Sequence, residues 1–251
     1  MMNWFDLSGK TAIVTGGSTG LGSGMSLGLA SAGADIVLVD HRERDEVASQ
    51  IRKMGRKVLT LHGDLSQMAV MEQVVNATLD NFGKVDILVN NAGIIRRKPA
   101  IDFSEKDWDD VMDLNAKTVF FLSQLCARDM MKRNYGKIIN IASLLSFSGG
   151  ITVPSYAASK GAVAQITKAL ANEWAKDGIC INAIAPGYMV TDNTKALREN
   201  PERNSAISAR IPAERWGTPA DLAGVAIFLA SKASDYVNGH LLTVDGGWMA
   251  R

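Results

Sequence analysis

Tyr156 and Lys160 stand four residues apart in the segment Ser155-Tyr156-Ala157-Ala158-Ser159-Lys160. If this segment is helical, the two side chains lie on one helix face and can act together. A phenol has a pKa near 10, and a neighbouring ammonium group lowers that pKa by stabilising the phenolate, which makes tyrosine a usable acid and base. The spacing therefore predicts a pair that transfers protons.

Two further polar residues could complete such a site. Ser143 follows an apolar run 13 residues before Tyr156, and its hydroxyl could donate a hydrogen bond to a substrate oxygen on which charge develops. Asn115 lies in the middle of the preceding helical stretch, where an asparagine taken alone equally suits a structural role of bonding to the backbone. We expect the four residues to form one catalytic site.

A glycine-rich turn, Thr15-Gly16-Gly17-Ser18-Thr19-Gly20-Leu21-Gly22, joins the first apolar run to a helical stretch. Glycine at such a turn lets the backbone approach a pyrophosphate, whose charge is stabilised by the N-terminus of the helix. The pattern is Gly-x-x-x-Gly-x-Gly rather than Gly-x-Gly-x-x-Gly, so a tight structural turn is the alternative interpretation. The position of the turn between a strand and a helix favours a dinucleotide site.

The second apolar run ends at Asp40, 18 residues after Gly22. A carboxylate at this place can bind both ribose hydroxyls and would repel a 2′-phosphate, which favours NAD over NADP. The uncharged Thr19 in the glycine turn also fits NAD, whereas Arg42 and Arg44 could weaken the discrimination. We therefore predict NAD as the cofactor, with NADP as the alternative.

The elements that would position these residues are seven short apolar runs rich in Val and Ile, each followed by a stretch with helical periodicity. Nearly continuous apolar runs are typical of strands covered by helices on both faces. The sequence thus predicts an α/β fold, a Rossmann-type doubly wound seven-stranded parallel sheet that forms a single domain over residues 1–251. The expected strands are Thr11–Thr15, Asp35–Asp40, Lys57–Gly63, Val85–Asn90, Lys137–Ala142, Ile179–Ala185 and His240–Val244.

Capping residues delimit several of the helices. Ser66 and Ser104 are expected N-caps, and Gly187 to Gly217 is a long irregular stretch, so we expect a substrate lid at about 188–217. Glycines are expected just after five helices, at Gly33, Gly55, Gly83, Gly136 and Gly178. The expected helices include Leu21–Ala32, Gln67–Phe82, Glu105–Lys132, Tyr156–Asp177 and Ala220–Ala230.

Composition excludes several classes of protein. The chain has 27 Lys and Arg against 26 Asp and Glu, a net charge of +1 that argues against a nucleic-acid partner. No apolar run reaches the roughly 18 residues of a membrane span, and the first residues do not resemble a secretory signal, so we expect a cytoplasmic protein without a membrane partner. Cys126 and Cys180 are expected to be buried reduced thiols, and no metal-ligand spacing is present.

Together these motifs resemble those of the short-chain dehydrogenase/reductase family, in order and over essentially the whole chain. The matching segments are Thr15-Gly16…Gly20-Leu21-Gly22, Asp64, Asn90-Asn91-Ala92-Gly93, Asn115, Ser143, Tyr156…Lys160 and Pro186-Gly187. The resemblance implies an enzyme that acts on CH–OH groups, with Tyr156 as general acid and base and Ser143 polarising the substrate oxygen. It also implies that Lys160 holds the nicotinamide ribose and lowers the pKa of Tyr156, and that Asn115 anchors a water in a proton relay.

The family also implies contacts to the cofactor and an oligomeric state. Asp64 and Leu65 would meet the adenine, and the segment 186–191 would meet the nicotinamide and its carboxamide. A homotetramer would be built from the helices Glu105–Lys132 and Tyr156–Asp177, whose apolar periodicity would equally suit burial on the sheet. The expected cofactor-binding residues are Gly16, Ser18, Thr19, Gly20, Leu21, Gly22, Asp40, Asp64, Leu65, Asn91, Ala92, Gly93, Tyr156, Lys160, Pro186, Gly187, Val190 and Thr191.

Finer matches point to a substrate class. Gly93-Ile-Ile-Arg96-Arg97, Ser143-Leu-Leu-Ser-Phe147 and Arg210-Ile-Pro-Ala-Glu-Arg-Trp-Gly217 are similar to a branch of the family that acts on deoxy-keto sugar acids in bacterial uronate and pectin breakdown. The carboxylate of such a small-molecule substrate suits a guanidinium, which binds it through paired hydrogen bonds. Arg96, Arg97 and Arg215 are candidates, each with solvent or a subunit interface as the alternative, and we expect Arg96 or Arg215 to bind the substrate along with Ser143 and Tyr156.

Two other functions stay open from the sequence. One is another short-chain enzyme, such as a polyol dehydrogenase or a 3-oxoacyl-carrier-protein reductase, although Asp40 and Thr19 weigh against the latter. The other is a non-catalytic protein that senses a dinucleotide, against which the complete set of Asn115, Ser143, Tyr156 and Lys160 argues.

Overall fold

A computed structural model of the chain describes residues 3–251. Seven parallel strands form one sheet in the order β3-β2-β1-β4-β5-β6-β7, which confirms the predicted fold class. The order reverses between β1 and β4, and ligands of such sheets bind at the carboxyl ends of the strands beside this reversal. The strands are β1 (Thr11–Thr15), β2 (Asp35–Asp40), β3 (Val58–His62), β4 (Ile87–Asn90), β5 (Gly136–Ile141), β6 (Ile179–Pro186) and β7 (Leu241–Val244).

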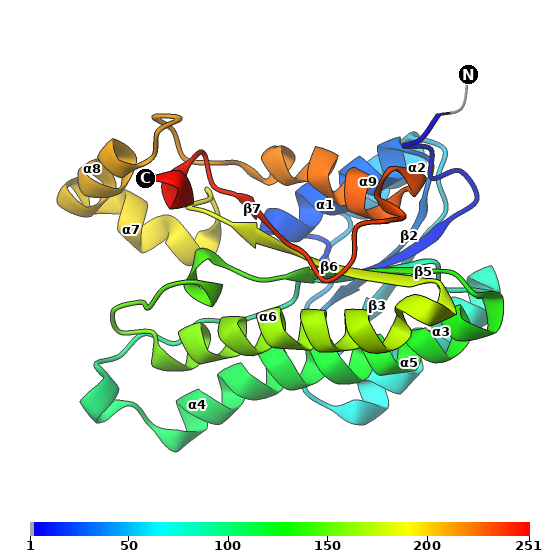
Figure 1. Cartoon of the computed structure of the whole chain (residues 1–251), viewed down its shortest axis with the longest axis horizontal. Helices are drawn as coiled ribbons and strands as arrows, with labels where there is room; N and C mark the ends of the chain where they lie inside the picture. The colour runs from blue at the N-terminus through cyan, green and yellow to red at the C-terminus, as the bar shows by residue number, and fades with distance from the viewer. Residues whose placement is uncertain (1–2) are drawn as a thin grey trace.

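Helices cover both faces of the sheet (Figure 1). One face carries α1 (Gly20–Ser31), α2 (Glu46–Lys53) and α9 (Ala223–Ala230), and the other carries α3 (Met68–Phe82), α4 (Glu105–Met112), α5 (Thr118–Arg133) and α6 (Pro154–Trp174). Two short helices, α7 (Lys195–Glu199) and α8 (Pro201–Arg210), lie beside the C-terminal residues at one end of the molecule. The segment 188–217, for which a lid was expected, contains these two helices.

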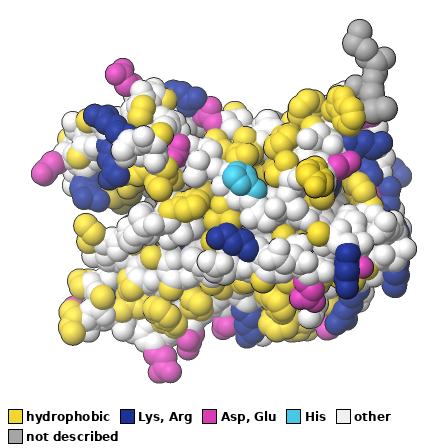
Figure 2. Space-filling model, in the orientation of Figure 1, with side chains coloured by type: hydrophobic (Ala, Val, Ile, Leu, Met, Phe, Trp, Pro, Cys, Tyr) yellow, Lys and Arg dark blue, Asp and Glu magenta, His cyan; other side chains and the backbone are white. Residues whose placement is uncertain are grey.

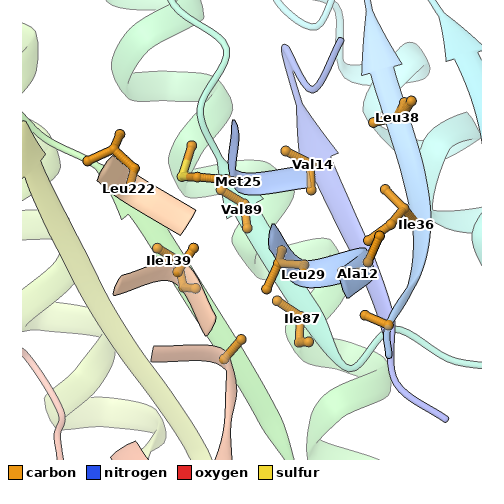
Figure 3. Packing of buried hydrophobic residues seen from close by; sticks show 14 of the residues in the cluster. Ala12, Val14, Met25, Leu29, Ile36, Leu38, Ile87, Val89, Ile139 and Leu222 are labelled. Atoms are coloured by element: carbon orange, nitrogen blue, oxygen red, sulfur yellow. The ribbon is translucent and has the colours of Figure 1, made fainter. Parts of the chain in front are cut away.

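The core is divided between the two faces because successive strand side chains point to opposite sides. In β1, Ala12 and Val14 point toward α1 and α9, where they meet Met25 and Leu29 (Figure 3). Ile13, between them, points toward α3 and α5 on the other face. All three are completely buried, so β1 anchors the glycine turn that follows it.

Left-handed residues end most helices where glycine was expected. Gly33, Gly55, Gly83 and Gly178 have φ angles between 73° and 106°, as predicted for residues after a helix. The prediction for Gly136 is wrong, because α5 ends at Asn134 in the left-handed conformation with φ 51°. Asparagine tolerates this conformation better than other side-chain-bearing residues.

Several strand and helix ends lie one to three residues from their predicted positions, and other features of the helices also differ from the prediction. Ser104 caps α4 by accepting a hydrogen bond from Asp107 N, as expected, but the N-cap of α3 is Gln67 rather than Ser66. The helix expected as continuous over Glu105–Lys132 is interrupted by a π-helical turn, η2 (Asp113–Lys117). The short helix α2 was not predicted.

Charges of both signs are interspersed on the face shown in Figure 2, without a field of one sign. Within residues 3–251, no helix combines the length and the apolar character needed to cross a bilayer. The same residues contain no cluster of His, Cys, Asp and Glu that could hold a metal ion. Cys126 is buried as predicted, whereas Cys180 is half-buried.

Candidate active site

The glycine turn after β1 has the shape of a phosphate cradle. Gly16 and Gly20 adopt φ angles of 62° and 50°, which favour glycine, and a Cβ on Gly22 would lie 1.9 Å from Gly16 O. Thr19 is the N-cap of α1 but makes no side-chain capping bond, so the first N–H groups of the helix are left for another acceptor. A turn without side chains at these glycines, together with the uncapped N–H groups of α1, suits the diphosphate of a dinucleotide.

The end of β4 is tied to this turn. Asn91 Nδ2 donates to Thr15 O at 2.9 Å and to Gly16 O at 3.1 Å. Thr15 Oγ1 accepts from the backbone N–H groups of Asn91 and Ala92, both at 2.9 Å. The structure therefore brings Asn91 and Ala92 beside the glycine turn, and the Asn91 amide shapes the turn itself.

Asp40 also contacts the glycine turn. Its carboxylate accepts a 2.6 Å hydrogen bond from Ser18 Oγ and longer bonds of 3.2 and 3.3 Å from Ser18 N. These bonds fix the carboxylate at the end of β2, beside the uncapped start of α1. A carboxylate held in this way repels a second anion at the same place.

Other expected cofactor residues occupy the same end of the sheet. Asp64 accepts from Ser66 N at 3.0 Å, and Leu65 is buried, with its carbonyl accepting from Thr118 Oγ1 at 2.7 Å. Gly187 follows β6 so closely to Asp245 that a Cβ would lie 2.6 Å from Asp245 Cα. At Gly187 the neighbouring backbone therefore leaves no room for a side chain.

The segment after Gly187 returns toward the glycine turn. Thr191 lies so close to Gly20 that a Cβ on Gly20 would be 3.7 Å from Thr191 Cγ2. Val190 is 37% exposed and donates its N–H to Gly217 O at 2.8 Å. The start of the 188–217 segment thus lies beside the cradle.

Tyr156 lies in the first turns of α6 and is half-buried. Burial raises the pKa of Tyr156, whereas a hydrogen bond with Ser143 and the positive charge of Arg97 act in the opposite direction and lower it. Ser143, at the end of β5, therefore lies beside the phenol as predicted. Arg97, one of the three arginines considered for the substrate carboxylate, also lies close enough to act on this phenol.

Lys160 lies beside Tyr156 on α6, as the spacing of the two residues predicts. Its Nζ lies 5.5 Å from the centre of the Tyr156 ring and donates a 2.6 Å hydrogen bond to Ile141 O. The side chain is buried, and burial lowers the pKa of Lys160 to about 8. The ammonium is therefore held by a strand carbonyl beside the phenol ring.

Ser146 and Ser159 are positioning residues that stand beside the four predicted catalytic residues. Ser146 Oγ accepts from Ser143 N at 3.3 Å and donates to Lys160 O at 2.7 Å, which ties the catalytic serine to α6. Ser159 Oγ donates to Tyr156 O at 2.8 Å. Their position within three residues of Ser143 and Tyr156 was the only signal in the sequence.

Asn115 lies completely buried in the π-helical turn η2. Its Oδ1 accepts from Ile94 N at 2.9 Å, and its Nδ2 donates to Ile94 O at 2.9 Å and to Ser159 Oγ at 3.2 Å. The side chain thus joins the loop after β4 to the helix that carries Tyr156. Single π turns inside helices often occur at functional sites.

Two of the three arginines considered for the substrate already have partners. Arg96 pairs with Asp107 and Asp110 at 3.5 and 3.4 Å, and Arg215 makes two hydrogen bonds of 2.7 and 2.8 Å to Asp221. Arg97 pairs with no carboxylate in the described part of the chain and donates a long 3.4 Å bond to Asn193 O. Arg96 and Arg215 are thus engaged with aspartates, whereas the Arg97 guanidinium has donors to spare.

A short-chain dehydrogenase family model, described as Enoyl-(Acyl carrier protein) reductase, matches residues 16–249. The chain belongs to the short-chain dehydrogenase/reductase family. This short-chain dehydrogenase/reductase is 59% identical over 252 aligned residues to a 2-dehydro-3-deoxy-D-gluconate 5-dehydrogenase of Dickeya dadantii, with 100% of both chains covered. It is accordingly an oxidoreductase that uses a nicotinamide dinucleotide.

Solved structures of the family share the whole fold. A protein of Agrobacterium tumefaciens described as a 2-deoxy-D-gluconate 3-dehydrogenase, with bound NADP, is 52% identical and superimposes with a TM-score of 0.94 over 100% of both chains. A gluconate 5-dehydrogenase of Burkholderia cenocepacia, in complex with NADP and tartrate, is 41% identical and has a TM-score of 0.95 over 99% of this chain and 98% of that chain. The short-chain dehydrogenase/reductase therefore has the fold of enzymes named for sugar acids.

Proposed function

We propose that this enzyme is a 2-dehydro-3-deoxy-D-gluconate 5-dehydrogenase, also called 2-deoxy-D-gluconate 3-dehydrogenase. It would interconvert a secondary alcohol and a ketone on a deoxy-keto sugar acid in uronate and pectin catabolism. The names of its relatives support the sugar-acid class. The observation that carries the proposal is Arg97, which lies in the loop after β4, pairs with no carboxylate among residues 3–251 and donates a long 3.4 Å bond to Asn193 O.

The cofactor would be held by the glycine turn, by Asp40 at the adenosine ribose and by the segment after β6 at the nicotinamide. When bound, a nicotinamide dinucleotide accepts a hydride from the carbinol carbon or returns one to the ketone. The oxidation of one alcohol by NAD⁺ gives one ketone, one NADH and one proton. Side chains of the enzyme must therefore accept that proton and pass it on.

Tyr156 takes the proton from the substrate hydroxyl in oxidation and returns it to the ketone oxygen in reduction. Ser143 donates a hydrogen bond to the same oxygen, which stabilises the negative charge that develops there. Lys160, with its pKa near 8, can hold or release a proton near neutral pH, and Asn115 would anchor the water that connects it to solvent. Ser146 and Ser159 keep Ser143 and Tyr156 in place.

Arg97 would bind the substrate carboxylate. A guanidinium binds a carboxylate through paired hydrogen bonds, and Arg97 has donors to spare because, within residues 3–251, it makes a single long hydrogen bond, to Asn193 O. Its place in the loop after β4 puts this charge at the carboxyl end of the sheet, beside the reacting groups. The sugar acid would then be fixed at one end by Arg97 and at the other by Tyr156 and Ser143.

NAD is our proposed cofactor because Ser18 fixes Asp40 where a 2′-phosphate would have to lie. The related structures that contain NADP make this the part of the proposal that most needs a direct measurement. A comparison of kcat/KM for NAD and NADP tests it. A preference for NADP would contradict the proposal.

We also propose a cytoplasmic homotetramer that uses α4, α5 and α6. Trp108 of α4 and Met131 of α5 are 41% and 36% exposed, which supports burial of these helices against other copies. Light scattering on the purified protein measures the mass of the assembly. A monomer would contradict this proposal.

The experiment that tests the function is a substrate panel in which NADH or NADPH is followed by absorbance. The panel contains deoxy-keto hexonates, polyols and acyl thioesters, each with both cofactors. The proposal predicts the highest kcat/KM with a deoxy-keto hexonate. A higher value with a polyol or a thioester would favour another short-chain enzyme, and no turnover with any of them would favour a dinucleotide sensor.

A further inference from the structure

Arg198, in the lid helix α7, is a half-buried arginine with a donor left over. Its guanidinium donates a 3.1 Å hydrogen bond to Thr191 O, but its Nε–H is buried and meets no acceptor within residues 3–251. It also pairs with no carboxylate there. The neighbouring Glu199 pairs instead with Lys195 at 3.7 Å. A buried donor without an acceptor is costly. An acceptor supplied by a bound molecule at this place would therefore stabilise the lid.

A second guanidinium is attached to the same turn of the lid. Arg97, from the body of the enzyme, donates to Asn193 O, and Arg198, from the lid, donates to Thr191 O. The Cα atoms of residues two apart are separated by at most about 7.6 Å. The two positive groups are therefore anchored near one another, although no carboxylate among the described residues neutralises either of them.

We propose that Arg198 is a specificity-determining residue that binds the carboxylate of the substrate together with Arg97. One arginine comes from the loop after β4 and the other from α7, so the anion connects the body to the lid. This inference rests on the proposed sugar-acid function. It adds that recognition of the carboxylate and closure of the lid are one event.

The carboxylate is a better match for Arg198 than the pyrophosphate of the cofactor. The cradle already offers the uncapped N-terminus of α1 to the pyrophosphate. Arg97, which shares the turn with Arg198, acts electrostatically on Tyr156, the group that meets the reacting end of the substrate. The two guanidiniums thus lie toward the substrate rather than toward the adenosine.

The test compares Arg198→Met and Arg198→Lys with the control Lys195→Met, which removes an exposed charge from the same short helix. KM and kcat are measured with the deoxy-keto hexonate and with its uncharged methyl ester. The Kd of NADH is measured by fluorescence without substrate. The Kd of gluconate for the enzyme–NADH complex is measured by calorimetry, which needs no turnover.

We expect Arg198→Met to raise KM for the acid, and Kd for gluconate, by about 10- to 100-fold, as is typical for the loss of hydrogen bonds to a charged group. KM for the methyl ester should rise much less, and the Kd of NADH should not change. Arg198→Lys should recover part of the preference for the acid because it keeps the charge. The control should behave like the wild type.

Three results would overturn the inference. An unchanged acid-to-ester ratio of kcat/KM in Arg198→Met would assign Arg198 a structural role in the lid. A raised Kd of NADH with an unchanged Kd of gluconate would assign it to the cofactor phosphate. Weaker gluconate binding by Lys195→Met to the same degree would show a general charge effect. If the wild type turns over no hexonate, the proposed function fails, but the gluconate titration still tests Arg198.

Discussion

The ammonium of Lys160 donates a 2.6 Å hydrogen bond to the carbonyl oxygen of Ile141, the last residue of β5. This bond fixes the lysine of α6 on the strand that leads to Ser143. The side chain is only 5% exposed, and burial lowers its pKa from 10.5 to about 8. The folded protein therefore disfavours the charged form of a group that the unfolded chain carries charged.

This buried lysine predicts how stability depends on pH. A shift of this size corresponds to roughly 3 kcal/mol of destabilisation, which is complete below pH 8 and disappears as the pH rises from about 8 to 10.5. We compare the free energy of unfolding of the cofactor-free wild type with that of Lys160→Met. The wild-type value minus the variant value should therefore increase between pH 7 and pH 10. Urea denaturation at several pH values measures it, with Lys168→Met, at an exposed position of α6, as control. A difference that stays constant or decreases contradicts the prediction.

Gly22 and Gly161 form a matched pair of glycine-to-alanine substitutions. At Gly22 a Cβ would lie 1.9 Å from Gly16 O, whereas at Gly161, inside α6, it would meet no atom within 4 Å. Gly22→Ala should destabilise the protein by about 1–3 kcal/mol and weaken NADH binding. Gly161→Ala should stabilise it by about 0.5–1 kcal/mol with unchanged NADH binding. Thermal unfolding and fluorescence titration check both, and equal effects at the two sites would refute the assigned role of the turn.

Much of the fold could be predicted because its determinants are local. Apolar runs specified all seven strands, and Gly33 and Gly83 marked helix ends because a left-handed residue is needed there. The left-handed residue after α5 was assigned wrongly, because Asn134, rather than Gly136, supplies that conformation. The π turn around Asn115 depends on contacts with Ile94 and Ser159 that no local pattern reveals.

The site was less predictable where ion pairs depend on the three-dimensional arrangement of the side chains. Tyr156, Ser143 and the glycine turn follow directly from their positions after strands. Arg96 could not be distinguished from Arg97 because adjacent residues in a loop point in different directions, one toward Asp107 and Asp110 and the other toward the lid. The Arg215–Asp221 ion pair joins residues only six positions apart, so this pairing could have been predicted from the sequence.

The Ser18–Asp40 contact predicts a change in cofactor preference. Asp40→Ala removes the carboxylate that would repel a 2′-phosphate, so the ratio of kcat/KM for NAD over NADP should fall by at least about 10-fold. Ser18→Ala should lower the ratio less, because Ser18 N still bonds to Asp40. Asp35→Ala, at the opposite end of β2, is the control and should leave the ratio unchanged. An unaltered ratio in Asp40→Ala would sink the assignment.

The three arginines predict distinct effects on substrate binding. Arg97→Met should raise KM for the sugar acid by about 10- to 100-fold, because it removes a charge without another partner. Arg96→Met and Arg215→Met should change KM by less than about threefold, since their guanidiniums are held by aspartates. Steady-state kinetics on the three variants decide this. A large effect at Arg96 or Arg215 alone would show that the ion pairs rearrange when substrate binds.

The central claim is that Tyr156 transfers the proton in a nicotinamide-dependent oxidation of a sugar acid. The most direct measurement is turnover of a deoxy-keto hexonate by Tyr156→Phe, followed through NADH absorbance, with the fully exposed Tyr236→Phe as control. We predict that kcat falls by about a hundred- to ten-thousand-fold in Tyr156→Phe, while its Kd for NADH and the activity of Tyr236→Phe stay at the wild-type values. Turnover by Tyr156→Phe at the wild-type rate would contradict the account.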